Sequence, residues 1–172
     1  MGPRLDYQID QLPPFISSLL PNLDVKITRP VTNIGEALDT SRRQYHSTRI
    51  IAILENQRTL VAFEKILGVT SLDLYNPSPR ADGRGFVFGE ARLPGRSGIV
   101  STFRLGTGLP DSMAFDDRVR KEVVHELGHM IGLEHCLTLS CVMRKSENVD
   151  DTDAKSDHYC DECKNNLKEL RH

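Results

Sequence analysis

The sequence predicts an α+β fold, close to the α/β class, in which helices pack on a mixed twisted sheet and a small C-terminal lobe follows. Segments with the periods of strands and helices interleave over the first 131 residues, and the strongest helix comes last among them. All four cysteines lie in the last quarter of the chain. The length of 172 residues, with 38% hydrophobic and 27% charged residues, fits one domain with two subdomains around a shared cleft.

The first 56 residues carry weaker patterns of both kinds. Strands are predicted where apolar and polar residues alternate, and helices where proline or a Ser/Thr cap opens an apolar run. In chain order these rules predict a strand at 5–9, a helix that Pro13-Pro14 opens and that ends before Pro21, a strand at 24–28, an irregular surface segment at 30–46, and a helix at 47–56.

The middle of the chain predicts most of the sheet. Residues 65–75 are rich in branched side chains and alternate around Gly68, which predicts one strand with a bend. Residues 76–85 form a loop by their Pro, Asp and Gly content. Two further strands, 85–91 and 98–105, follow each other across a short turn sequence, so we expect them to pair antiparallel.

The clearest element is a helix at 113–131. Its apolar residues recur on one face at helical spacing: Val119, Val123, Val124, Leu127 and Ile131. Gly132 is a suitable end point, because glycine accepts the left-handed turn that ends many helices. The residues beyond are polar, and a last helix is expected at 161–170. We therefore expect an N-terminal subdomain at 1–132 and a C-terminal subdomain at 133–172.

Residues 125–129 of the long helix read H-E-x-x-H. His125 and His129 project from one face of a helix, so both imidazoles can reach one ion at about 2.0–2.1 Å. They lie roughly opposite the apolar stripe, so we expect this face to look into open space. Glu126 lies just off the histidine face, where it can accept a proton from a zinc-bound water rather than bind the metal.

A third histidine strengthens the prediction of zinc. The pattern extends to H-E-x-x-H-x-x-G-x-x-H, in which Gly132 breaks the helix and the returning chain can bring His135 to the same ion. Three neutral ring nitrogens leave a fourth position for water, as catalytic zinc sites do. The sequence therefore predicts a catalytic zinc on His125, His129 and His135, on what would be the active-site helix.

With these residues the sequence resembles the metzincin clan of zinc peptidases, and most nearly the archaemetzincin family. In that family the third histidine is followed directly by cysteine, then by C-x4-C-x-M and by a distal C-x-x-C. The matching residues here are His135-Cys136, Cys141-Val-Met143 and Cys160-x-x-Cys163. The similarity runs from about Lys65 to the end of the chain.

This resemblance implies a metzincin-type fold and a role for Met143. In the clan, a methionine on a tight turn packs beneath the metal without binding it, although an ordinary core methionine would pack in much the same way. Lys145 stands where some other metzincins carry a tyrosine metal ligand, so that ligand is expected to be absent.

The cysteines form two closely spaced pairs, as do the ligands of many tetrahedral thiolate sites. The four are Cys136, Cys141, Cys160 and Cys163. Four soft sulfur ligands with no open position predict a structural zinc, and the family resemblance implies the same. The alternatives are two disulfides or free thiols. His158 is a spare candidate ligand or an exposed histidine.

Charge and composition argue against several classes of partner. Twenty-two Lys and Arg against 24 Asp and Glu give a formal charge of −2, which disfavours a protein that grips nucleic acid or an anionic membrane. Acidic residues also outnumber basic ones between 144 and 164, around the cysteines. No aliphatic run approaches the ~20 residues of a membrane helix, and the first residues lack an apolar signal stretch. We expect a cytoplasmic protein, a monomer, with neither nucleic acid nor membrane as partner.

Together these features predict a zinc-dependent metallopeptidase that hydrolyses peptide bonds in a peptide or protein substrate, with one catalytic and one structural Zn2+. The alternative is a metzincin-like zinc protein that binds a peptide or partner with little or no turnover; the complete set of Glu126 and three histidines favours the peptidase. By resemblance, the substrate would lie along an edge strand from the region 86–105. Arginines in this part of the chain could bind a substrate carboxylate or simply face solvent: Arg80, Arg84, Arg92, Arg96 and Arg104.

Overall fold

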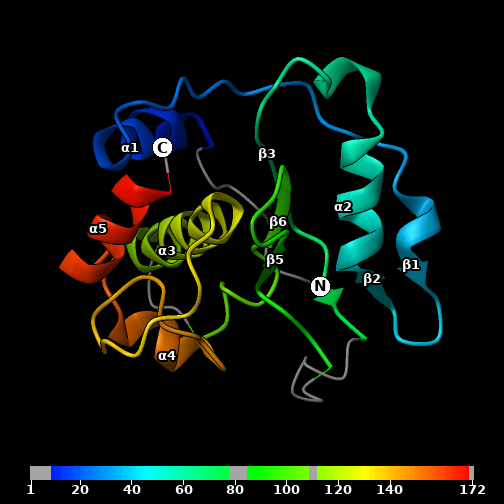
Figure 1. Cartoon of the computed structure of the whole chain (residues 1–172). Coiled ribbons are helices and arrows are strands. Elements are labelled where there is room, and N and C mark those ends of the chain that lie inside the picture. Colours follow the sequence, from blue (N-terminus) through cyan, green and yellow to red (C-terminus); the bar gives the residue numbers. More distant parts are fainter. Residues whose placement is uncertain (1–8, 78–84, 109–111, 171–172) are drawn as a thin grey trace.

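The chain forms two small mixed sheets, and helices lie on both sides of the central one (Figure 1). The computed structural model describes residues 9–77, 85–108 and 112–170. The long helix α3 (Ser112–Ile131) packs on one side of strands β5 (Gly89–Ala91) and β6 (Ser97–Ser101), and α2 (Ser47–Glu55) packs on the other. The predicted α+β class is confirmed.

Each sheet has three strands and mixes parallel with antiparallel pairing. The sheet nearest α3 has the order β3-β6-β5, in which β3 (Ile66–Thr70) is parallel to β6 and β5 is antiparallel to it. The predicted antiparallel pairing of the last two strands is therefore confirmed, although both are shorter than expected. The second sheet has the order β1-β2-β4 and consists of β1 (Leu38–Asp39), β2 (Gln44–His46) and β4 (Leu74–Tyr75). An antiparallel bridge between Leu74 and Val87 connects the two sheets.

Two of the predicted strands are wrong. The single strand predicted at 65–75 is instead two strands, β3 and β4, in different sheets. The strand is interrupted between Thr70 and Leu74 rather than bent at Gly68. Gly68 lies inside β3, at a place where a Cβ would meet Ile99 Cδ1 at 2.7 Å. Residues 24–28 alternate in sequence but pair with no strand among the described residues, and most of them are exposed. Alternation alone does not make a strand without a neighbour to complete its hydrogen bonds.

The start of the chain follows the predicted helices more closely than the predicted loops. Helix α1 (Leu12–Leu19) is confirmed, while residues 5–8 of the expected first strand lie outside the described residues. The irregular segment 30–46 contains the β1-β2 hairpin, which its sequence did not reveal. Helix α2 is capped by His46 without a side-chain hydrogen bond, so the expected Ser or Thr cap is wrong. This part of the chain also contains three short 3₁₀ turns, at Ile9–Gln11, Gly35–Ala37 and Arg58–Leu60.

The main apolar core surrounds α3 and continues into the C-terminal part of the chain. It includes residues from both predicted subdomains, for example Val123, Met143 and Leu167, and the division at 132 stays a prediction. Helix α5 (Asp161–Glu169) agrees with the expected last helix, whereas α4 (Val149–Ala154) was not expected. A second core lies beneath α2. In the described part of the chain, no helix has the length and apolar character needed to cross a bilayer.

Candidate active site

Helix α3 is tightly packed where it carries the H-E-x-x-H residues. Each residue from Lys121 to Met130 is buried, and His125 and His129 are only 5% and 8% exposed. The turn at 142–144 packs against His125 and strand β5 packs against Glu126, yet both residues and His129 line a cleft. The expected open space at the histidine face is therefore confirmed as a cleft.

Backbone carbonyls fix the orientation of two histidine rings. His125 Nδ1 donates to the Val142 carbonyl at 2.8 Å, and His129 Nδ1 donates to the Leu133 carbonyl at 2.7 Å. A carbonyl only accepts, so Nδ1 carries the hydrogen and Nε2 is left with its lone pair in each neutral ring. The two Nε2 atoms face each other at 3.0 Å. Lone pairs at this distance repel, and a shared cation relieves the repulsion.

The third histidine reaches the same place because α3 ends at Gly132. This residue has φ +122°, which a side chain disfavours, and its N–H bonds to the Gly128 and His129 carbonyls. The ring of His135 then lies 5.3 and 4.8 Å from those of His125 and His129, centroid to centroid. One nitrogen of each ring lies within 4.8 Å of the others.

These distances suit zinc. Ring nitrogens bound at about 2.0–2.1 Å in a tetrahedron would be about 3.3 Å apart. The structure therefore brings together the three predicted ligands, and their number leaves one position of a tetrahedron free of histidine.

The surroundings keep the three imidazoles neutral, which is the form that binds a metal. Burial lowers the pKa of His125 well below its usual value and also lowers the pKa of His129. Desolvation, followed by the charges of His129 and Lys145, lowers the pKa of His135 to about 4 although this residue is exposed at the cleft. Burial, and then the nearby Glu122, raises the pKa of Glu126 well above its usual value, and Lys155 opposes this rise.

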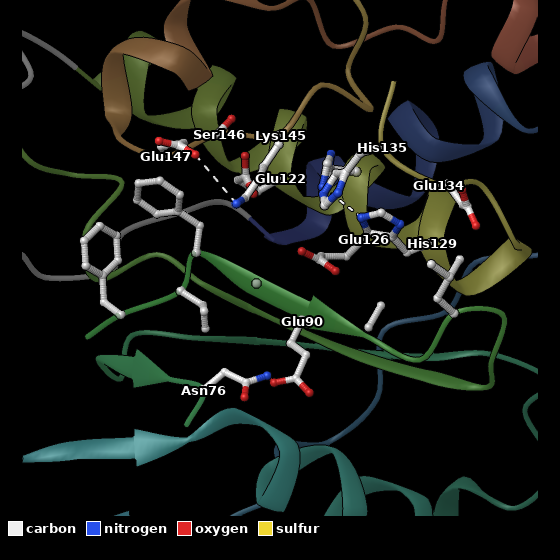
Figure 2. A pocket seen from close by; sticks show the side chains of 17 residues that line it. Asn76, Glu90, Glu122, Glu126, His129, Glu134, His135, Lys145, Ser146 and Glu147 are labelled. Carbon is white, nitrogen blue, oxygen red and sulfur yellow. Dashed lines mark hydrogen bonds and ion pairs between the residues drawn. The ribbon is translucent and has the colours of Figure 1, made fainter. Parts of the chain in front are cut away.

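The histidines and Glu126 open onto a cleft of about 650 Å³ (Figure 2). One wall is the edge strand β5, and another is the segment Lys145, Ser146 and Glu147. Glu126 lies so close to β5 that a Cβ on Gly89 would be 2.5 Å from its Oε1 atom, while its Oε2 atom has no hydrogen-bond partner among the described residues. Sequence reasoning missed Gly89, since only the folded contact with Glu126 makes a glycine necessary there.

Met143 packs directly beneath the H-E-x-x-H turn. Its side chain is fully buried, and a Cβ on Gly128 would be 2.4 Å from its sulfur. This contact agrees with a packed base below the histidines and equally with an ordinary core methionine, so the special role of Met143 stays a prediction. Lys145, two residues further on, lines the cleft and lies 3.6 Å from Glu147.

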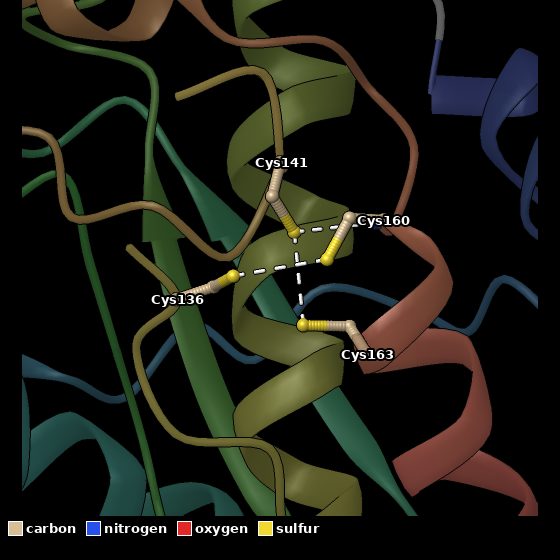
Figure 3. A group of neighbouring side chains, drawn as sticks. All are labelled: Cys136, Cys141, Cys160 and Cys163. Carbon is tan, nitrogen blue, oxygen red and sulfur yellow. Dashed lines mark hydrogen bonds between the residues drawn. The ribbon is translucent and has the colours of Figure 1, made fainter. Parts of the chain in front are cut away.

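The four cysteines converge from two segments of the C-terminal part (Figure 3). The Sγ atoms of Cys136 and Cys160 are 3.7 Å apart, as are those of Cys141 and Cys163. A disulfide requires about 2.05 Å, whereas thiolates around zinc at about 2.3 Å lie about 3.8 Å apart. All four are free cysteines, so the disulfide alternative is wrong and the set fits a zinc ion.

Ionisation of the cysteine cluster is uneven. Burial opposes ionisation of Cys160, but hydrogen bonds from the Cys163 backbone and from neighbouring thiols lower its pKa to about 7. Burial raises the pKa of Cys141 and of Cys163. His158 is outside the cluster: its ring is 60% exposed and pairs with Asp157.

The three described arginines among those considered for substrate binding make other contacts. Arg96 donates to the carbonyls of Leu60 and Phe63, and Arg104 forms a bidentate pair with Asp73. Arg92 lies 3.7 Å from Glu55. None of the three lines the cleft, and the remaining two, Arg80 and Arg84, lie outside the described residues.

Comparison with known proteins gives one consistent result. The model of peptidase family M54 matches residues 17–169. A protein of Archaeoglobus fulgidus named archaemetzincin is 42% identical over 140 residues, which cover 81% of this chain and 79% of that protein. The crystal structure of archaemetzincin from Methanopyrus kandleri superposes with a TM-score of 0.82 at 34% identity and covers 98% of this chain and 88% of that one. The crystal structure of the A. fulgidus protein, complexed with malonate, gives 0.76 at 37% identity and covers 94% and 93%.

Proposed function

The chain belongs to peptidase family M54, the archaemetzincins, and is a zinc-dependent metallopeptidase; we propose that Glu126 and the three cleft histidines are its catalytic machinery. Its substrates are peptides or proteins. The observation that carries the proposal is the convergence of three ring nitrogens within 4.8 Å of one another beside a buried carboxylate in an open cleft.

The donor sets indicate which residues would hold each ion. The three histidines would hold the catalytic zinc, and the four cysteines would hold a structural one. Zinc on the histidines supplies a Lewis acid that polarises the scissile carbonyl and makes a water molecule more acidic. The cysteines offer no position for a substrate, because four thiolates complete a tetrahedron.

Glu126 is the proposed general base. Its carboxylate accepts a proton from the attacking water and returns it to the leaving amine. The Gly89 backbone limits the carboxylate on one side, and the unpartnered Oε2 atom is available for the proton. Glu126 lines the cleft but is only 4% exposed, so little solvent competes for this oxygen.

Strand β5 is the edge strand along which we propose that the substrate backbone binds. It is the outer strand of the order β3-β6-β5, and Gly89, Glu90 and Ala91 all line the cleft. An extended peptide could add to this edge by backbone hydrogen bonds, which would place its carbonyl groups along the histidine side of the strand.

A digest of a peptide library tests the proposal. Wild-type protein is compared by mass spectrometry with Glu126→Gln, which keeps the size of the side chain but cannot accept a proton, and with Glu36→Gln, which removes an exposed carboxylate on a distant 3₁₀ turn. We expect Glu126→Gln to bind the same zinc and to lose about 10²- to 10⁴-fold in kcat. Glu36→Gln should cleave as the wild type does. Equal product profiles for wild type and Glu126→Gln would end the assignment of Glu126.

A further inference from the structure

A buried ion pair lies beside the catalytic residues and has no part in the mechanism above. Glu122 lies on α3 one helical turn before Glu126 and lines the cleft, and Lys155 is the residue that follows α4. Lys155 Nζ lies 3.0 Å from Glu122 Oε1, with side-chain exposures of 0% and 4%. In the part of the chain that the structure describes, Glu122 Oε1 has no polar partner other than Lys155. Removing two charges from water is costly, so such a pair requires an explanation.

Lys155 has a second contact, to the chain beneath the histidines. Its Nζ atom also donates to the Arg144 carbonyl at 3.3 Å. Arg144 directly follows Met143, and Val142 on the other side of Met143 supplies the carbonyl that accepts from His125 Nδ1. One ammonium group therefore connects helix α3 to the turn 142–144, which orients a ring on the same helix.

Among the described residues, the other backbone hydrogen bonds of this turn lead away from α3. The Val142 N–H donates to the His158 carbonyl, the Met143 carbonyl accepts from the Cys136 N–H, and the Arg144 N–H donates to the Cys141 carbonyl. All three partners belong to the cysteine-bearing part of the chain. These bonds hold the turn within the C-terminal part but leave its position relative to α3 to packing, to the His125 bond and to Lys155.

We propose that Lys155 and Glu122 are a pair of positioning residues that hold the turn 142–144 against α3 and so keep His125 aimed at the metal. Neither is among the proposed metal ligands. The inference rests on the proposed histidine zinc site. Loss of a group that helps to orient a metal-binding histidine typically lowers metal affinity by about 10- to 100-fold.

A neighbouring ion pair offers a matched control. Arg118 on α3 forms a bidentate contact of 2.6 Å with Asp153 on α4, and also donates to the carbonyls of Leu105 and Thr107. This pair joins α3 to α4 itself, whereas Lys155 of the first pair directly follows α4. Within the described residues, the Arg118–Asp153 pair makes no hydrogen bond or ion pair to the turn 142–144. Asp153→Asn therefore weakens the joint between α3 and α4 without changing the support of His125.

The test measures metal binding at the histidine site in the full chain. The site is emptied with a chelator, zinc affinity is measured by competition with a chromophoric chelator, and the site is then refilled with cobalt(II), whose visible spectrum reports ligand geometry. We expect Lys155→Met to lose about 10- to 100-fold in zinc affinity and to change the cobalt spectrum. Asp153→Asn should lower Tm while leaving affinity and spectrum as in the wild type.

A double variant keeps the proposal testable if Lys155→Met does not fold. Glu122→Gln/Lys155→Met leaves no uncompensated buried charge, so it should fold, yet it lacks the contact to Arg144 and should show the same loss of affinity and the same altered spectrum. A double variant with wild-type affinity and spectrum would overturn the proposal, as would an equal loss in Asp153→Asn. None of these readouts requires hydrolysis, so they separate this inference from the assignment of Glu126.

Discussion

At the scale of single residues, the position of Glu126 depends on the absence of a side chain on the strand below it. A Cβ at Gly89 would lie 2.5 Å from Oε1 and 2.7 Å from Cγ of Glu126. We expect Gly89→Ala to displace the carboxylate and to lower kcat about 10²-fold, since a shift of about 1 Å in a catalytic group has such an effect. Steady-state kinetics on a cleaved peptide and Tm measure the two consequences separately.

Gly35→Ala is the matched control for this change. Gly35 has no atom within 4 Å of the position of an added Cβ, so the substitution should leave kcat unchanged. If Gly89→Ala keeps wild-type kcat, then Glu126 can move without loss and its contact with β5 has no catalytic importance.

Some residues of the site could be predicted from their local spacing in the sequence, whereas others depend on contacts between distant segments. His125, Glu126 and His129 could be predicted because their spacing within one helix already places them on one side. The cysteines could be predicted because their paired spacing suits one ion. Gly89 and the pair Glu122–Lys155 could not, because their constraints arise only when distant segments meet.

At the scale of elements, α3 and α4 are joined by the pair of Arg118 and Asp153, and this joint should depend on pH. Hydrogen bonds from Arg118 lower the pKa of Asp153 below its ordinary value of 3.8. A carboxyl with a lowered folded-state pKa stabilises the protein fully above its unfolded pKa and loses this contribution as the pH falls through the folded one. Asp153 is 48% exposed, so solvent screening limits the contribution to roughly 1 kcal/mol at pH 7.

Comparison of wild type with Asp153→Asn isolates this contribution. At pH 7 the variant should unfold about 2–4 °C lower, as expected for roughly 1 kcal/mol in a chain of this size. The difference between the two proteins should shrink from about pH 5 downward. Protons compete with zinc for its ligands, so both proteins are expected to lose zinc as the pH falls, and the difference in Tm is therefore measured rather than either value alone. A difference that stays constant to pH 3 would contradict the assigned ion pair.

Helices were predictable where apolar residues repeat on one face over several turns. Strands were less predictable, because their bounds depend on pairing with other strands. The stripe of α3 spans five apolar positions, and its helix is confirmed. Residues 65–75 carry a continuous strand pattern, yet they divide between two sheets because Leu74 pairs with Tyr45 while the earlier residues pair with β6. Helix α4 was missed because its six residues are mostly polar and its start depends on a cap, in which the Asn148 side chain accepts from Asp151 N–H.

At the scale of the whole molecule, α3 is the element that the two halves of the site share. Strand β5 approaches it from the N-terminal part, and the turn 142–144 approaches it from the C-terminal part. The cysteine cluster holds the latter part together by joining the loop after α3 to the first turn of α5. The two proposed zinc ions thus have different mechanical roles, one exposed to the cleft and one inside the fold.

This difference predicts two steps of zinc loss. The protein should contain about two zinc ions per chain, and a mild chelator should remove one through the cleft, where His135 is exposed. Loss of that ion should change Tm by only a few degrees, whereas the second should leave only on unfolding, because thiolate zinc sites contribute about 10–16 kcal/mol in small modules. Elemental analysis after each chelator step, with Tm measured in parallel, follows both ions.

Single-site variants assign the two steps. His135→Ala should abolish the first zinc and leave Tm near that of the chelated wild type. Cys163→Ser, which replaces a buried ligand that links α5 to Cys141, should remove the second zinc and destabilise the C-terminal part. Because the turn 142–144 belongs to that part, Cys163→Ser should also weaken the histidine site, whereas His135→Ala should leave the cysteine site intact. A purified protein with one zinc, or loss of both ions at the same chelator concentration, would contradict this one-way dependence.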